Sequence, residues 1–172
     1  MRAKFICFSV AFLLCGFFRV NAQSIYVSKK NHYQVKIAGI YKSTLDSLNG
    51  GYQDLFTIMH PDSSVKYLIN IIRTKSPVSD NEYLKSVEYE ASFSDTISKI
   101  EEVKEVNYKS LKGIRFLKRI TSPQRVFLSY SISTIVKGDL VVITYNTIER
   151  NFYKYQSEFD DIVNSITFNL QE

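Results

Sequence analysis

The chain has 172 residues, of which 22 are basic, 17 are acidic and 45% are hydrophobic. Basic and acidic residues are interleaved along the chain, and this argues against a nucleic-acid binder, which normally concentrates its basic residues on one surface. Both cysteines, Cys7 and Cys15, lie close to the start, so the remaining residues can form neither a disulfide nor a thiolate metal site.

The beginning of the chain has the pattern of a secretory signal peptide. Arg2 and Lys4 precede an apolar stretch at 5–18, which is shorter than the about 20 residues that a bilayer span needs. Val20 and Ala22 occupy the −3 and −1 positions of a cleavage site. An uncleaved membrane anchor is the alternative interpretation.

Cleavage after residue 22 would leave a single domain, residues 23–172, starting at Gln23. Without Arg2, Lys4 and Arg19 this domain has 19 basic and 17 acidic residues. We expect it to have no membrane span and to work in the periplasm or outside the cell. Its 150 residues suffice for one hydrophobic core without disulfides or metal.

The first half of the mature domain predicts three strands, His32–Ala38, Asp54–His60 and Lys66–Arg73, because apolar and polar residues alternate there. The stretch Tyr41–Gly51 lacks this alternation. We interpret it as irregular, with one helical turn at Thr44–Leu48.

A first long helix is predicted to begin at Ser79. Ser79 and Glu82 have the spacing of a capping box, in which each side chain bonds the backbone N–H of the other residue. Leu84, Val87 and Ala91 then share one helical face, and the end of the helix beyond Ala91 is left open.

The second half predicts four strands joined by short turns, followed by a second helix and a short closing strand at 166–168. Apolar residues form one stripe on the helix, while Lys154, Glu158 and Asp161 face water. The predicted strands are Glu101–Lys109, Gly113–Thr121, Arg125–Val136 and Leu140–Ile148, and the helix is Arg150–Asn164.

The predicted order is therefore β-β-β-α-β-β-β-β-α-β. Strands joined by hairpins form an antiparallel sheet, and amphipathic helices must bury their apolar face against it. We predict an α+β fold in which one mostly antiparallel sheet is covered by two main helices.

Three stretches resemble the PsbP/DcrB-like superfamily of small exported or organellar domains. They are the opening strand at His32–Ile37, the strand–turn–strand at Asn107–Ile114 and the closing helix and strand at Phe159–Phe168. The superfamily serves in binding and assembly, as photosystem accessory subunits, envelope proteins and a nuclear Ran-binding relative. The resemblance implies a PsbP-like sandwich and a non-enzymatic role, and it supplies no functional residue.

The sequence contains only weak matches to known catalytic motifs. Ser63 and Lys66 form an S-x-x-K pair and Ser79-Asp80-Asn81 an S-D-N triplet, as in penicillin-recognising enzymes. A chain rich in serine and lysine produces such matches by chance, and Ser63 lies in a predicted turn. The two histidines, His32 and His60, fall on separate strands without carboxylates at ligand spacing, so we predict no metal and no cofactor.

The densest basic run lies on the second of the four later strands. Arg115 and Arg119 share one face of that strand, whereas Ile114, Phe116 and Ile120 point the other way. We expect the arginines to pair with the carboxylates of the neighbouring strand; contact with an anionic partner is the alternative. The run comprises Lys109, Lys112, Arg115, Lys118 and Arg119, and the carboxylates are Glu101, Glu102 and Glu105.

A candidate partner surface follows from the hairpin around Gly138. A two-residue loop places odd positions of the first strand opposite even positions of the second. One face then gathers small polar residues and is expected to be open, or only partly covered, near its centre. These residues are Ser129, Ser131, Ser133, Thr144 and Asn146, flanked by Phe127 and Ile148. A solvated face without a partner is the alternative.

The sequence leaves two candidate functions. The first is an exported, non-catalytic binding or assembly module whose partner is an unidentified envelope protein. The second is a hydrolase of unrecognised type that uses serine or carboxylate chemistry. A pocket with convergent polar groups would favour the hydrolase.

Overall fold

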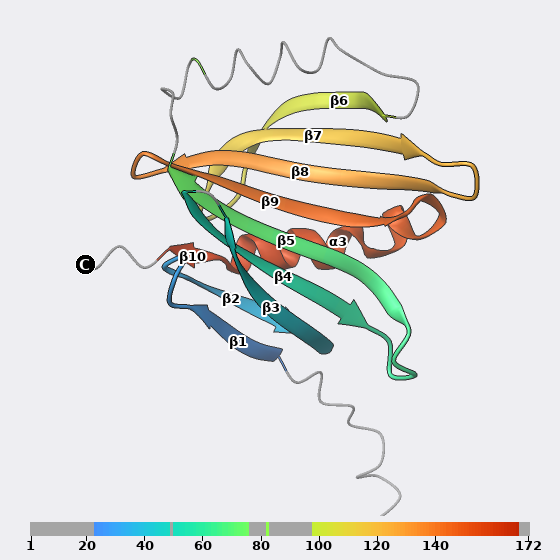
Figure 1. Ribbon diagram of the computed structural model, residues 1–172, viewed down its shortest axis with the longest axis horizontal. Coiled ribbons are helices and arrows are strands. Elements are labelled where there is room, and N and C mark those ends of the chain that lie inside the picture. Colours follow the sequence, from blue (N-terminus) through green and yellow to red (C-terminus); the bar gives the residue numbers. More distant parts are fainter. Residues whose placement is uncertain (1–22, 49, 76–81, 83–97, 169–172) are drawn as a thin grey trace, which may run out of the picture.

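A computed structural model describes residues 23–48, 50–75, 82 and 98–168. Its strands form two antiparallel sheets, one of seven strands in the order β3-β4-β5-β9-β8-β7-β6 and one of three in the order β1-β2-β10 (Figure 1). The elements in chain order are β1 (Gln23–Ser28), β2 (Tyr33–Ala38), β3 (Ile40–Leu48), β4 (Gly51–Met59), β5 (Val65–Lys75), β6 (Ser98–Asn107), β7 (Lys112–Thr121), β8 (Val126–Val136), β9 (Asp139–Ile148), α3 (Glu149–Ser165) and β10 (Thr167–Phe168).

Helix α3 and the three-stranded sheet form a second layer on one face of the seven-stranded sheet (Figure 1). The core lies between these layers. From the large sheet it includes Phe56, Ile69, Ile132 and Ile143, each at most 1% exposed, and from β2 it includes Tyr33, which is fully buried. One continuous core therefore joins the two layers, and the edge strands pack partly buried side chains such as Tyr26, Tyr41 and Val106 against it.

Helix α3 buries the apolar stripe that the sequence predicts. The buried residues are Phe152, Tyr155, Phe159, Ile162 and Val163. On the other side Lys154 and Asp161 are exposed, as expected. Glu158 is different, because its carboxylate accepts a 2.9 Å hydrogen bond from the hydroxyl of Tyr67, which is 2% exposed. The helix is thus tied to β5 by a polar contact as well as by packing.

The prediction of an irregular stretch at Tyr41–Gly51 with a helical turn at Thr44–Leu48 is wrong. Residues Ile40–Leu48 form a nine-residue strand that pairs antiparallel with β4 along its whole length. Eight of its nine residues are exposed, so neither face required the alternation by which a half-buried strand is recognised. The first strand, β1, was also not expected.

The predicted single sheet with two main helices is only partly correct. The α+β architecture and the antiparallel strands are confirmed, but the strands divide into two sheets. Within the described residues the only helical element is α3. Apart from Glu82, the expected first helix, from Ser79 to beyond Ala91, lies outside the described residues, and so does the expected signal peptide at 1–22.

A buried carboxylate joins the two sheets. Asp54 on β4 is fully buried, and its oxygens accept four hydrogen bonds of 2.7–2.8 Å from the small sheet and the turn that follows β1. Burial and the neighbouring carboxylate raise the pKa of Tyr33, and the pKa of Tyr26 is raised in the same way. Both phenols therefore keep their protons and act as donors. The four donors are Tyr26 Oη, Ser28 Oγ, Asn31 Nδ2 and Tyr33 Oη.

Candidate docking face

The second face of the large sheet carries the predicted partner surface. The β8–β9 hairpin turns through Lys137 and Gly138, both with positive φ, and this fixes the predicted register. Ser131 pairs with Thr144, and their hydroxyl oxygens are 3.1 Å apart. Ser129 pairs with Asn146. No described helix or strand lies over this face, and α3 is on the opposite side (Figure 1).

The hydroxyl groups on this face are less accessible than expected. Ser129 and Ser131 are each 8% exposed and Ser133 is 2% exposed, whereas Thr144 and Asn146 are half-buried. Side chains at paired positions of neighbouring strands lie about 5 Å apart, so longer ones shield a serine between them. The three serines are therefore buried, whereas the sequence predicted a face that is open, or only partly covered, near its centre.

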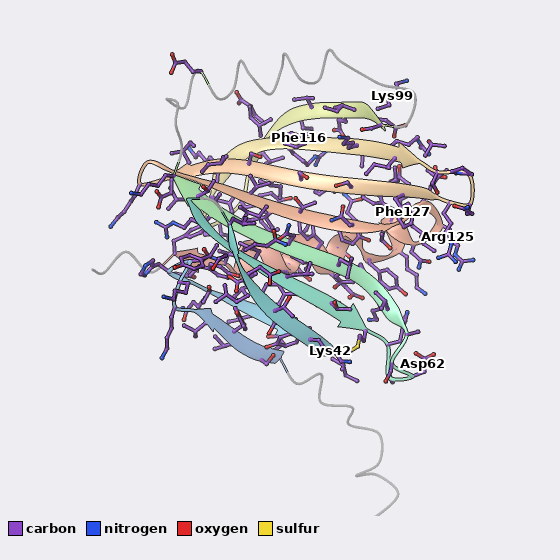
Figure 2. The ribbon with its side chains drawn as sticks, viewed as in Figure 1. Lys42, Asp62, Lys99, Phe116, Arg125 and Phe127 are labelled. Carbon is purple, nitrogen blue, oxygen red and sulfur yellow. The ribbon has the colours of Figure 1, made fainter. Side chains whose placement is uncertain are left out.

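Apolar side chains from six strands share the face of these serines. Phe116 pairs with Ser131 across β7 and β8, and Phe127, at the start of β8, is 38% exposed (Figure 2). Phe127 and Ile148 were expected from the sequence as flanking residues, whereas the positions of the others depend on the strand order of the whole sheet. The partly exposed set comprises Leu55, Leu68, Ile72, Ile100, Phe116, Ile120, Val142 and Ile148, together with the exposed Val103 and Phe127.

Two arginines of the basic run lie on the opposite face and are paired, whereas Lys118 lies on the docking face, opposite Ser129. Arg115 Nη2 lies 2.6 Å from Glu102 Oε1, and Arg119 bonds both Glu101 and Glu149. Hydrogen bonds from Lys104 and Arg115 lower the pKa of the Glu102 carboxyl group. The expected cross-strand pairing is confirmed for Glu101 and Glu102, which leaves the two arginines committed to contacts within the domain.

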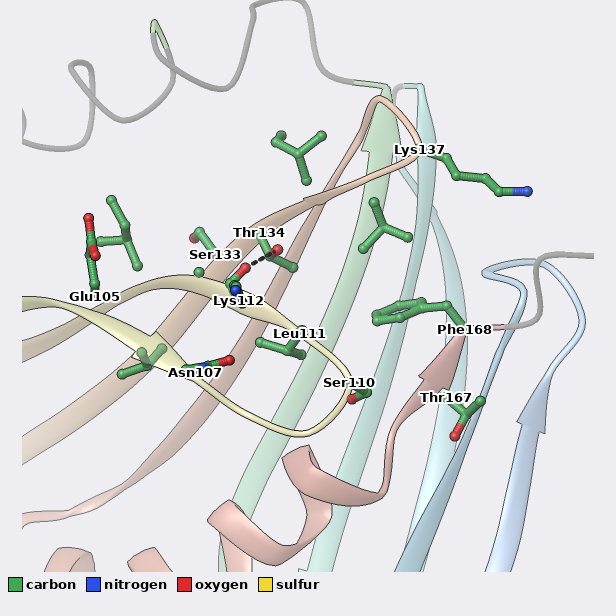
Figure 3. Close-up of a pocket in the computed structure, with 15 residues that line it drawn as sticks. Glu105, Asn107, Ser110, Leu111, Lys112, Ser133, Thr134, Lys137, Thr167 and Phe168 are labelled. Carbon is green, nitrogen blue, oxygen red and sulfur yellow. Dashed lines mark hydrogen bonds between the residues drawn. The ribbon is translucent and has the colours of Figure 1, made fainter.

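A cavity of about 1070 Å³ lies at the end of the sheet where the β6–β7 hairpin, the β8–β9 turn and β10 approach one another (Figure 3). Its walls include Leu111, Ile135 and Phe168. Ser133 lines it too, and the Ser133 hydroxyl has no hydrogen-bond partner among the described residues. The serine row of the docking face thus ends in this cavity.

The polar groups of the cavity do not form a catalytic set. Glu105 is the one carboxylate among its lining residues, which include no histidine, cysteine or aspartate. Thr134 donates its hydroxyl to the carbonyl oxygen of Lys112 at 2.5 Å and is therefore engaged in holding β8 to β7. A serine nucleophile needs an adjacent base, and the residues lining the cavity offer none to Ser133.

The S-x-x-K pair does not assemble a nucleophile. Ser63 lies in the β4–β5 turn with a φ of 66°, and Lys66 Nζ lies 3.6 Å from Glu158 on α3. Ser79-Asp80-Asn81 lies outside the described residues. Among the residues that can be placed, no three histidine, cysteine or carboxylate side chains converge as metal ligands, and no helix has the length and hydropathy of a membrane span.

The fold matches two solved structures of low sequence similarity. Cyanobacterial PsbP (CyanoP) from Synechocystis sp. PCC 6803 superposes with a TM-score of 0.58 at 13% identity over 90% of this chain and 96% of its own. The chain has a PsbP-like fold. A protein from Bacteroides thetaiotaomicron VPI-5482 matches with a TM-score of 0.61 at 10% identity over 87% of this chain, which spans about half of that protein (49%). No protein-family model and no curated protein sequence matches the chain.

The PsbP-like fold confirms the resemblance drawn from the three sequence stretches. The strand–turn–strand at Asn107–Ile114 is the β6–β7 hairpin that borders the cavity. Gly113, near its end, approaches β8 so closely that a Cβ atom would lie 2.3 Å from the carbonyl oxygen of Ser133. Only glycine fits there, which explains the motif by packing rather than by chemistry.

Proposed function

We propose that the mature domain is an exported, non-catalytic binding module of the cell envelope that docks a partner protein on the face of its large sheet opposite α3. The observation that carries this proposal is the partly exposed apolar side chains on a face that no described helix or strand covers. A PsbP-like fold is compatible with many functions, so the exposed apolar side chains, and not the fold, support docking.

The composition of the face supports docking over simple solvation. An antiparallel sheet that faces water on one side normally places polar residues outward. Here Leu68 and Ile72 of β5, Val142 of β9 and Phe116 of β7 point outward, each partly exposed. Contiguous apolar surface of this kind marks sites where proteins associate. The hydrogen-bonded pair Ser131–Thr144 lies within it, so these two hydroxyl groups already satisfy each other.

The cavity at the sheet end supports a binding role over hydrolysis. Its walls mix apolar side chains, such as Leu111, Ile135 and Phe168, with polar ones, and the Ser133 hydroxyl among them has no hydrogen-bond partner within the described residues. Apolar walls with placed polar groups are typical of sites that hold a ligand in a fixed orientation. In the part of the chain that the structure describes, no group is hydrogen-bonded to the Ser133 hydroxyl, as the general base of a serine hydrolase would be.

Export is tested by the mature N-terminus. The leader pattern predicts that the native protein begins at Gln23, with its side chain free or cyclised onto the terminal amine. Mass spectrometry of the protein purified from its own host measures this directly. A native protein that begins at Met1 and fractionates with the cytoplasm would contradict the compartment and the envelope partner together.

Docking is tested by charge placed on the apolar face. Phe127→Lys is expected to abolish capture of the partner from the envelope fraction, because it forces a cation into an apolar contact. Phe127 is 38% exposed, so the substitution should change the free energy of unfolding by no more than about 0.5 kcal/mol. The readout is quantitative mass spectrometry of proteins retained by the tagged domain.

The matched control is Tyr153→Lys. Tyr153 is an aromatic residue of α3 that is 74% exposed on the other side of the molecule. The domain with Tyr153→Lys should retain the same proteins as the unmodified domain. Equal retention by all three proteins would contradict the docking face, and so would loss of the partner with Tyr153→Lys alone.

A further inference from the structure

Strand β3 is an unprotected sheet edge. It is the terminal strand of the large sheet and pairs with β4 alone among the described strands. In an antiparallel strand every second residue directs its N–H and C=O away from the existing partner. Eight of the nine β3 residues are exposed, including Ile40 at 50%, Leu45 at 46% and Leu48 at 38%. Such an edge is a template for pairing with another strand.

The opposite edge, β6, differs in ways that block pairing. Its register with β7 shifts between Ile100 and Glu102, and shifts of this kind bend a strand away from a flat edge. Two of its carboxylates are engaged by Arg115 and Arg119. The register of β3 with β4 is continuous from Ile40 to Leu48, and β3 contains no proline. Of the two edges of the large sheet, β3 is the one suited to strand addition.

The sequence of β3 is complementary to itself in one antiparallel register. When Thr44 lies opposite Thr44 of a second copy, all nine residues pair, and Lys42 lies opposite Asp46 at two symmetric positions. Ile40 then lies opposite Leu48, so apolar residues also meet. Opposite charges and apolar pairs at directly facing positions both stabilise an antiparallel pair.

Other registers lose this match. A shift of two residues in one direction places Lys42 opposite Thr44 and Asp46 opposite Ile40, and a shift in the other places Lys42 opposite Leu48. A shift of one residue would bring side chains from opposite faces together. Parallel in-register pairing would set Lys42 against Lys42. Charge complementarity therefore selects the register centred on Thr44.

We propose that two copies of this chain pair through β3, antiparallel and centred on Thr44, so that their large sheets join into one continuous sheet. The partner is a second copy because the β3 sequence is complementary to itself when the two strands run antiparallel. The two-fold axis passes between the paired Thr44 residues at right angles to the sheet. The side chain of Thr44 lies beside Leu55 at the edge of the docking face, but the pairing rests on the backbone edge of β3 and stands independently of the partner proposed there.

Cysteine cross-linking tests the register. In the full chain with Cys7→Ser and Cys15→Ser, Thr44→Cys provides one thiol. Directly opposed residues of antiparallel strands have Cα atoms about 5 Å apart, within disulfide range. We expect a disulfide-linked dimer under mild oxidation. The control is Lys42→Cys in the same background, whose two thiol positions would lie about 13 Å apart along the strands and should remain monomeric. Equal cross-linking of both variants, or none of Thr44→Cys, would overturn the proposal.

Charge exchange tests the pairing without cysteine. Lys42→Glu and Asp46→Lys each place like charges at both symmetric positions, and each alone should weaken self-association at least about tenfold. Mixed together, the two variants form a pair in which every facing position is again oppositely charged. Sedimentation of differently labelled variants should show a mixed dimer that neither forms alone. A mixture no tighter than the single variants would refute this interface, as would an unmodified chain that stays monomeric at its highest soluble concentration.

Discussion

Replacing Phe159 with alanine is expected to lower the free energy of unfolding by about 3–5 kcal/mol, through lost burial and the cavity left behind. Phe159 is fully buried in the middle of α3. Its ring stacks on Tyr145 with centroids 5.3 Å apart and meets Tyr130 edge-on at 5.6 Å. Because both tyrosines belong to central strands, few neighbouring groups can move to refill the space. Urea-induced unfolding measures the change.

The matched control for Phe159→Ala is Asp161→Ala. Asp161 lies two residues further along α3 and is exposed, so its loss should cost no more than about 0.5 kcal/mol. Glu158 would be a poorer control, because it accepts the hydrogen bond of the buried Tyr67 hydroxyl. Similar losses of unfolding free energy for Phe159→Ala and Asp161→Ala would mean that α3 does not bury the face that carries Phe159.

The alternation of apolar and polar residues predicted strands that bury one face, but it did not predict the strands that bury neither. Strands β5 and β9 alternate buried and partly exposed residues because one side faces the core, and β8 alternates apolar residues with serines. In β1 the pattern is inverted, since Ile25 and Val27 are exposed while Ser28 is buried against Asp54. The hydrogen bond to a distant carboxylate decides this orientation, and nothing local in the sequence signals it.

The features of the candidate site that depend on local geometry could be predicted from the sequence. The two-residue turn at Lys137-Gly138 fixed the pairing of Ser131 with Thr144, and the structure confirms that register. The sequence also indicated that Phe116 points away from Arg115. That Phe116 lies beside Ser131 depends on the order of strands within the sheet, which is a non-local property. The apolar surroundings of the serines therefore had to come from the structure.

Replacing Asp54 with alanine is expected to cost at least about 3 kcal/mol of unfolding free energy, because several buried donors would lose their only acceptor at once. The sequence placed Asp54 only at the start of a strand, yet its carboxylate accepts hydrogen bonds from Ser28, Asn31 and Tyr33 through one oxygen and from Tyr26 through the other. Since every donor comes from β1, β2 or the turn between them, the substitution should loosen the small sheet first. Hydrogen exchange of the β1 and β2 amides, measured beside urea-induced unfolding, separates this local effect from global loss.

Asp54→Asn distinguishes hydrogen bonding from mere loss of volume. An asparagine oxygen can keep the three bonds from Ser28, Asn31 and Tyr33, while its amide group donates to the Tyr26 hydroxyl, which can also accept. We therefore expect Asp54→Asn to cost about half as much as Asp54→Ala, with most of the amide protection in β2 retained. Asp161→Asn, at an exposed position of α3, should leave both measurements unchanged. A loss below about 1 kcal/mol for Asp54→Ala would show that the two sheets are held by apolar packing alone, because the unpaired donors would then have found water without disturbing the fold.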